Sequence, residues 1–291
     1  MKRKENLQIN SATKNSYLPV AIQGYEGSFH EEAARHFFGK QVSIYPCDNF
    51  RTLIKSATDS KLTSAAVMAI ENSIAGSILP NYNLLHQSTL TITGEIYMQI
   101  KQQLLTVQGV ELDQIREVHS HTMALQQCFG YLEKQKWKLV ETDDTALSAK
   151  KLSQNQSKTI AVVASKLAAL HYGLQVLTPN IQTQKNNYTR FLILNRANEA
   201  TPIENANKAS AMFITDHSKG SLARVLTLIA SFGINLSKLQ SFPIPGSEFR
   251  YAFHVDLEFD NVETFYRAWD KMETVTQALK LYGIYKTGLW K

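Results

Sequence analysis

Cysteine and long apolar runs are scarce in this chain of 291 residues. Its two cysteines, Cys47 and Cys128, do not resemble the disulfide framework of many secreted proteins, so we expect reduced thiols and a cytoplasmic location. No apolar run approaches the ~18 residues that a membrane-spanning helix needs, which argues against a membrane protein. Residues 1–18 are polar and carry a basic Lys2-Arg3-Lys4 with no apolar stretch after it. We interpret them as a disordered tail and not as a secretory signal.

Concentrated positive charge and the common cofactor motifs are also missing. The net charge is +6, but the longest basic run after the tail is Lys150-Lys151, and no basic stripe alternates with aromatic residues, which argues against nucleic acid as a partner. The sequence contains no GxxxxGK(S/T), GxGxxG, HExxH or CxxC motif. His119 and His121 would share one side of a strand, but no further ligand is spaced to complete a metal site. We therefore predict a protein without cofactor or metal.

The hydrophobic pattern from residue 19 to 196 alternates between short apolar runs and helical periods. Such alternation predicts an α/β fold with a mostly parallel sheet and helices on both sides. Because two successive sets of elements occur, we expect two lobes with a cleft between them. The expected strands are 20–23, 42–45, 65–70, 104–107, 117–119, 138–140, 159–163 and 191–194, and the expected helices are 29–38, 50–57, 124–134, 145–152 and 165–171.

A polar segment, residues 197–207, divides this part of the chain from the rest and is interpreted as a linker. Residues 208–291 then predict a second unit with the order strand, helix, strand, strand, helix, strand, which is the ferredoxin-like α+β (βαββαβ) arrangement. The expected strands are 211–215, 235–240, 250–257 and 279–285, and the expected helices are 221–232 and 262–272.

Polar clusters stand between a strand and the next helix at five places, residues 24–28, 71–77, 120–122, 143–145 and 164–165. Residues at the carboxyl ends of parallel strands face the binding crevice, and helix starts there favour carboxylates. Any one cluster is explained equally well by helix capping, since Ser, Thr, Asp and Asn are the preferred caps. Their common position at one end of the strands favours a site for a small anionic ligand.

A sixth polar cluster, residues 186–191, precedes a strand, so capping does not explain it. Thr189 offers a hydroxyl donor. Arg190 offers a fork for a carboxylate or a partner for a structural ion pair, and the sequence leaves both interpretations open. For Phe191 we expect a place in the core.

These clusters, in this order, resemble prephenate dehydratases. The stretches that carry the resemblance are GYEGSF at 24–29, IENSIAGS at 70–77, SHTMALQQC at 120–128, DTA at 144–146, YGL at 172–174 and NYTRF at 187–191. The resemblance implies a catalytic region at residues 19–196 with two lobes like those of type 2 periplasmic-binding proteins. It also implies conversion of prephenate to phenylpyruvate, water and carbon dioxide in phenylalanine biosynthesis.

The resemblance assigns roles to individual residues. The family's catalytic threonine corresponds to Thr189, its assisting serine and glutamine correspond to Ser120 and Gln127, and its Asn-Ser pair corresponds to Asn72 and Ser73. The other candidates for substrate binding are Gly27, Ser28, Thr145, Asn187 and Arg190. This chain departs from the family at Thr122-Met123, where Pro-Gln is common, and at Thr183, where Asp is common.

Residues 208–291 resemble an ACT domain, the amino-acid-sensing module attached to this family, and the resemblance implies phenylalanine as an allosteric effector. Residues 220–223 look like its Gly-Ala-Leu-Ala effector motif. Residues 236–243 look like its second motif, Leu-Ser-Lys-Ile-Glu-Ser-Arg-Pro, with Gln240 and Phe242 in place of Glu and Arg, so the effector's identity stays open. A structural dimerisation module is the alternative, and we expect a homodimer or homotetramer. Deleting 208–291 is expected to preserve activity and abolish inhibition. The candidate effector-binding residues are Gly220, Ser221, Leu222, Ala223, Gln240 and Ser241.

Two rival functions remain at this point. Arogenate, which carries an amine where prephenate has a ketone, is a second candidate substrate. A catalytically silent two-lobed protein that binds an amino acid is a rival from another class. Because only about 19 residues precede the first expected strand, we expect no fused chorismate mutase domain.

Overall fold

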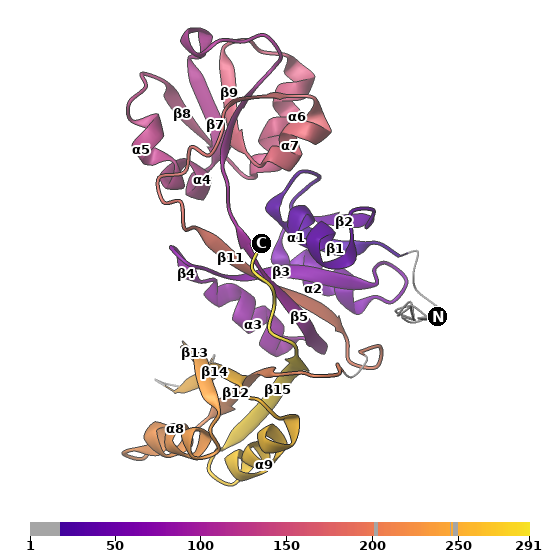
Figure 1. Ribbon diagram of the computed structural model, residues 1–291, viewed down its shortest axis with the longest axis vertical. Helices are drawn as coiled ribbons and strands as arrows, with labels where there is room; N and C mark the ends of the chain where they lie inside the picture. The colour runs from indigo at the N-terminus through magenta and orange to yellow at the C-terminus, as the bar shows by residue number, and fades with distance from the viewer. Residues whose placement is uncertain (1–17, 201–202, 245, 247–249) are drawn as a thin grey trace, which may run out of the picture.

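The computed structural model describes residues 18–200, 203–244, 246 and 250–291, and it places two sheet lobes and a smaller third sheet in a row (Figure 1). All of the tail predicted for residues 1–18 except Leu18 lies outside the described residues. No helix in the described part of the chain has the length and apolar character that a bilayer crossing requires. Cys47 and Cys128 are buried free thiols.

The first lobe is built on a sheet with the strand order β2-β1-β3-β11-β5, and a short β4 pairs with β3. Its helix α1 packs on one face through Ala33 and Ala34, while α2 and α3 pack on the other through residues such as Leu53 and Leu85. The elements are β1 (Val20–Gln23), α1 (Phe29–Phe38), β2 (Ile44–Cys47), α2 (Phe50–Thr58), β3 (Ala65–Asn72), β4 (Gly76–Ser77), α3 (Leu79–Gln87), β5 (Leu90–Gln99) and β11 (Tyr188–Arg196).

The second lobe is built on a sheet with the strand order β10-β6-β9-β7-β8. Its core joins apolar side chains of these strands to the helices α4, α6 and α7. The elements are β6 (Gln103–Thr106), a 3₁₀ turn η1 (Leu112–Gln114), β7 (Glu117–His121), α4 (Thr122–Gln127), α5 (Phe129–Leu132), β8 (Lys138–Thr142), α6 (Thr145–Asn155), β9 (Ile160–Ala164), α7 (Lys166–Tyr172) and β10 (Gln175–Thr178).

The prediction of a mostly parallel sheet is wrong for both lobes. Strand β11 returns from the second lobe and inserts between β3 and β5, antiparallel to both. In the second lobe β6 pairs antiparallel with β9 and β10, and only β7 lies parallel to its neighbours β8 and β9. The chain crosses between the lobes near residues 100–102 and 180–187, and these crossings produce the mixture of parallel and antiparallel strand pairs. A hydrophobic pattern does not indicate where a chain crosses from one lobe to another.

Several elements differ from those expected from the sequence. Helix α3 and the long strand β5 were not predicted, and the helix expected at 124–134 is broken at Cys128, whose φ of −101° and ψ of 7° end α4. The other expected elements of the two lobes are present, with ends that shift by a few residues. Strand β5 was missed because Gly94 and Glu95 interrupt the apolar–polar alternation that predicts a half-buried strand.

The third sheet has the order β13-β14-β12-β15, and its elements follow the predicted strand and helix order. Helices α8 and α9 pack on one face, and the other face packs against the first lobe through Met212, Phe242 and Tyr282. The elements are β12 (Lys208–Ile214), α8 (Ser221–Ser231), β13 (Asn235–Pro243), β14 (Tyr251–Glu258), α9 (Val262–Glu273) and β15 (Ala278–Tyr285).

Residues 287–291 leave this third sheet and run back along the first lobe, as the yellow trace in Figure 1 shows. The Lys291 N–H donates to the Tyr97 carbonyl at 2.8 Å, so the segment adds to the free edge of β5. Trp290 stacks on Tyr97 with ring centroids 4.6 Å apart. The third sheet is therefore attached to the first lobe at two places, through its face and through this returning segment.

Candidate active site

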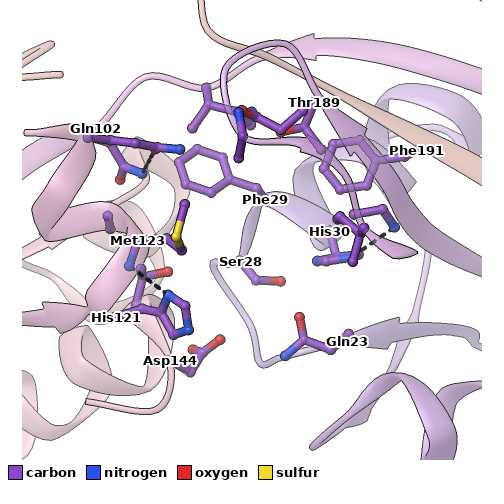
Figure 2. Close-up of a pocket in the computed structure, with 18 of the residues that line it drawn as sticks. Gln23, Ser28, Phe29, His30, Gln102, His121, Met123, Asp144, Thr189 and Phe191 are labelled. Carbon is purple, nitrogen blue, oxygen red and sulfur yellow. Dashed lines mark hydrogen bonds between the residues drawn. The ribbon is translucent and has the colours of Figure 1, made fainter. Parts of the chain in front are cut away.

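A cavity of about 470 Å³ lies between the two lobes, and residues of both lobes line it. Figure 2 shows Gln102, Met123, His121 and Asp144 on one side, with Gln23, His30, Phe191 and Thr189 on the other. Apolar side chains of Phe29, Phe50, Ile78, Ile100, Met123 and Phe191 form much of its wall. The cavity has the size and mixed lining expected for a site that binds a small molecule.

Strand ends and helix starts position the polar side chains, as the sequence predicted. Ser28 caps α1 by accepting the Glu31 N–H at 3.3 Å, and Asp144 caps α6 by accepting the Leu147 N–H at 2.8 Å. The first N–H groups of a helix lack acceptors within the helix, and Phe29, the first residue of α1, lines the cavity. A helix start carries a partial positive charge, but at α6 the Asp144 carboxylate already accepts N–H groups of the first turn, so the start of α1 is the one left to an anionic ligand. Thr145, the first residue of α6, also lines the cavity.

Thr189 and Asn72 are direct cross-strand partners on β11 and β3, and both line the cavity. Because β11 runs antiparallel to β3, its start lies at the same edge of the sheet as the carboxyl end of β3. The Asn72 side-chain amide donates to Thr189 Oγ1 at 3.0 Å. This is why a polar cluster that precedes a strand belongs to the same site as the clusters that follow strands.

The orientation of the Asn72 amide is fixed by its surroundings. Its Oδ1 accepts the N–H groups of Ile74 at 3.0 Å and Ala75 at 2.9 Å, so its Nδ2 must face Thr189 and Asn187. Thr189 Oγ1 is therefore an acceptor in this pair. No acceptor for the Thr189 hydroxyl proton occurs among the described residues, so the proton is available to a molecule in the cavity.

The second lobe contributes two amides to the cavity. Gln102 Nε2 and Gln127 Oε1 lie 3.5 Å apart, and Gln102 is nearly buried. Gln127 was predicted from the sequence and Asp144 belongs to the predicted polar cluster 143–145, whereas Gln102 and His30 were not predicted at the site. Gln102 lies in the crossing between β5 and β6, where no motif marks it, and His30 was read as part of an ordinary helix.

The charges at the cavity are acidic, with no Lys or Arg among its described lining residues. Burial raises the pKa of Asp144, while the backbone N–H groups of Leu147 and Ala146 oppose that shift. Burial lowers the pKa of His30 to about 3. His30 Nε2 accepts the Ala69 N–H at 3.2 Å. This contact also requires the neutral ring, because a protonated ring nitrogen cannot accept a hydrogen bond.

We expect His30→Gln to reduce the acid sensitivity of folding. Since the folded pKa of His30 is about 3 and an unfolded histidine has a pKa near 6.5, the unfolded chain takes up a proton first as the pH falls. Stability is therefore fully present above about pH 6.5 and is lost below it. Between pH 7 and 5 the wild type should lose about 2 kcal/mol more than the variant, measured by urea unfolding. Equal losses in the two proteins would show that His30 is not buried and neutral.

A model of the family described as prephenate dehydratase matches residues 20–199. The chain belongs to this family. It is 37% identical over 263 residues to Arogenate dehydratase 2 of Petunia hybrida, which covers 86% of the chain and 66% of that protein. The chain thus spans about two thirds of the length of this curated relative.

Two solved structures match 92% of the chain. Prephenate dehydratase from Arthrobacter aurescens in complex with L-Phe superposes with a TM-score of 0.83 at 25% identity, covering 90% of that chain. A protein described as GqqA, a novel type of quorum quenching acylase, superposes with a TM-score of 0.84 at 28% identity and is covered to 98%. Thr189, which the sequence resemblance predicted to be the catalytic threonine, lines the interlobe cavity.

Other residues expected at the site from the family resemblance lie outside this cavity. Ser120 is fully buried and donates to the Val163 carbonyl at 2.6 Å. Gly27 has φ +86°, and a side chain there would meet Ala168 Cα at 2.6 Å, so close packing against α7 explains the glycine. Ser73 Oγ contacts the backbone of residues 186 and 188. Gly27 thus lies at a contact between the lobes, Ser120 supports the second lobe from within, and Ser73 supports the edge of the site.

Asn187 and Arg190 are also withdrawn from the cavity. Asn187 is fully buried and accepts from Asn72 at 2.7 Å, which makes it a support for the Asn72–Thr189 pair. Arg190 is 4% exposed and forms ion pairs with Glu95 and Asp256. The sequence left open whether Arg190 binds a carboxylate or forms a structural ion pair, and the structure shows the ion pair.

A second cavity of about 250 Å³ lies in the third sheet region, beside the start of α8. Ser221 and Leu222 line it, together with Asp216, Arg250 and Tyr251. The other candidate effector residues are not among its lining residues: Gly220, Ala223, Gln240 and Ser241. Gln240 donates to the Ser241 carbonyl at 2.9 Å, on β13. The two predicted effector motifs therefore do not both line this cavity.

Proposed function

We propose that this chain converts prephenate to phenylpyruvate with loss of water and carbon dioxide, and that arogenate is the alternative substrate, which would give phenylalanine. The observation that carries the proposal is the Thr189 hydroxyl in the interlobe cavity, oriented by Asn72 with its proton free. Membership of the prephenate dehydratase family supports the reaction type. The relative from Petunia hybrida, named as an arogenate dehydratase, supports testing both substrates.

The chemistry asks the protein to help a hydroxide leave. The ring C–O bond breaks with its electron pair on oxygen, the pair of the ring–carboxylate bond moves into the ring, and a proton is taken up to complete the water. The new benzene ring supplies the driving force. Because a threonine hydroxyl is a very weak acid, Thr189 acts as a positioned hydrogen-bond donor to the departing oxygen, in a role worth about 10²–10⁴-fold.

The distribution of charge at the cavity suits decarboxylation. A strong grip on the ring carboxylate would stabilise the ground state, since that group loses its charge as carbon dioxide leaves. The apolar wall that includes Phe29 and Phe191 offers no such grip. The side-chain carboxylate of the substrate is held instead at the start of α1, where Phe29 and Ser28 line the cavity and the helix start carries a partial positive charge.

We further propose that residues 19–196 form the catalytic unit, 197–207 the linker and 208–291 an ACT-type regulatory unit that binds phenylalanine. The βαββαβ order and the cavity beside Ser221 and Leu222 support this proposal. The L-Phe complex of the Arthrobacter aurescens relative also supports it. Assembly as a homodimer or homotetramer and a cytoplasmic location stay predictions.

The test is a product assay on the purified protein with prephenate and with arogenate. We expect phenylpyruvate, read by its ultraviolet absorbance in alkali, or phenylalanine, read by chromatography, and we expect added phenylalanine to slow the reaction. Binding of either substrate without an aromatic product would favour the silent binding protein. Among the described lining residues no Ser or Thr hydroxyl forms a hydrogen bond with a histidine, so the cavity gives no support for an acylase that uses a Ser–His pair.

A further inference from the structure

The end of strand β3 carries two neighbouring cross-strand pairs that face opposite ways. Asn72 and Thr189, here called the front rung, line the cavity. Glu71 and Arg190, here called the back rung, are the next pair along the same two strands. Successive side chains of a strand point to opposite faces, so the back rung faces the third sheet.

A β-bulge separates these two rungs from the rest of the β3–β11 ladder. The register shifts between Arg190 and Phe191, and Ile70 is left without a partner on β11. The front rung and the back rung therefore form a short ladder of two pairs on this side of the bulge. Within that ladder the back rung is the neighbour of the front rung. Bulges loosen a ladder locally and often stand beside active sites, where they direct side chains.

Side chains of the third sheet hold both members of the back rung. Lys238 on β13 forms an ion pair with Glu71 and donates to Ser77 Oγ at 2.7 Å. Asp256 on β14 forms an ion pair with Arg190. The side chains of Lys238 and Glu71 are 15% and 30% exposed, so water only partly screens their attraction.

Lys238 is also placed at the base of the hairpin that carries Asn72. Glu71 and Ser77 are cross-strand partners on β3 and β4, and Asn72 pairs with Gly76 in the next position. By bonding to both Glu71 and Ser77, Lys238 fastens the two arms of this hairpin. The turn between the arms supplies the two N–H groups that fix the Asn72 amide.

We propose that Lys238 is a positioning residue for the reaction: from the third sheet it holds the Glu71–Ser77 pair, and through this hairpin it keeps Asn72 oriented toward Thr189. The expected effect of Lys238 on kcat rests on the proposed dehydratase function. Lys238 stands two residues before Gln240 on β13, the strand that resembles the second effector motif. The regulatory unit thus has a direct mechanical link to the reaction centre within one chain.

The experiment compares Lys238→Met with Lys238→Arg and with Lys280→Met. Lys280 crosses the same interface, where its ammonium donates to the carbonyls of His86 and Ser88, but it touches neither rung. We expect Lys238→Met to lower kcat about 3- to 30-fold with little change in KM, while Lys238→Arg and Lys280→Met stay close to the wild type. Amide hydrogen exchange at residues 73–75 should rise in Lys238→Met alone.

Several outcomes would overturn the positioning role. These are a wild-type kcat and exchange rate in Lys238→Met, an effect on KM alone, or an equal loss in Lys280→Met. If the wild type makes no aromatic product from either substrate, the proposed function fails instead. The exchange measurement then still decides whether Lys238 fastens the hairpin, because it does not depend on turnover.

Discussion

Replacing Thr189 by Val is expected to lower kcat by about 10²–10⁴-fold with little loss of folding. Valine has nearly the same shape but cannot donate a hydrogen bond to the departing oxygen. Asn72 Nδ2 would keep its contacts with Asn187 Oδ1 at 2.7 Å and the Tyr188 carbonyl at 3.1 Å, so the rest of the front rung is retained. The measurement is steady-state kinetics on whichever substrate the wild type prefers, with the unfolding midpoint as a check on structure.

Thr189→Ser is the matched control, because it keeps the hydroxyl and removes only a methyl group. We expect it to retain activity within about tenfold of the wild type, with the hydroxyl still bonded to Asn72. A Thr189→Val enzyme that also stays within tenfold would remove this hydroxyl from the mechanism. A large rise in KM with unchanged kcat would reassign Thr189 to substrate binding.

The second large effect is expected on stability, from Asp256→Ala. Asp256 is 1% exposed and belongs to a buried cluster with two positive charges, Arg190 and Lys208, and two negative charges, Asp256 and Glu95. Burial by itself would raise the pKa of Asp256, but the Arg190 guanidinium holds it well below the usual range. Removing this carboxylate leaves a buried charge unpaired, which costs about 3–5 kcal/mol.

Asp216→Ala provides the comparison, because Asp216 also pairs with an arginine but at the surface. Its distance to Arg224 is 3.4 Å, with side chains 50% and 52% exposed, so the change should cost about 0–1 kcal/mol. Urea unfolding of both variants gives the two free energies. Asp256→Asn keeps the shape and removes only the charge, so it separates the electrostatic loss from the cavity. Equal losses in Asp256→Ala and Asp216→Ala would show that the buried cluster is not tightly held.

The same cluster changes the expected result of deleting residues 208–291. The sequence alone predicted an active enzyme without inhibition. The structure shows that the deleted part supplies Asp256 and Lys208 to the cluster and covers apolar residues of the first lobe such as Tyr82 and Ile92. We now expect the shortened chain to lose stability, so loss of activity in it would not by itself locate the regulatory site.

The sequence determined most of the local elements and the residue types of the site. Apolar runs and capping residues such as Ser28 and Asp144 fixed where helices begin, because these signals act within one turn of the chain. The order of six short motifs was enough to indicate the family, and five of the predicted site residues line the cavity: Ser28, Asn72, Gln127, Thr145 and Thr189.

Only the tertiary structure decided which of these residues face the substrate and which support them. Thr189 and Arg190 are adjacent in sequence, yet one lines the cavity and the other pairs with Asp256, because a strand sends successive side chains to opposite faces. That division depends on the insertion of β11 between β3 and β5, which joins residues about 115 positions apart. Such pairings are long-range, and no local pattern in the chain encodes them.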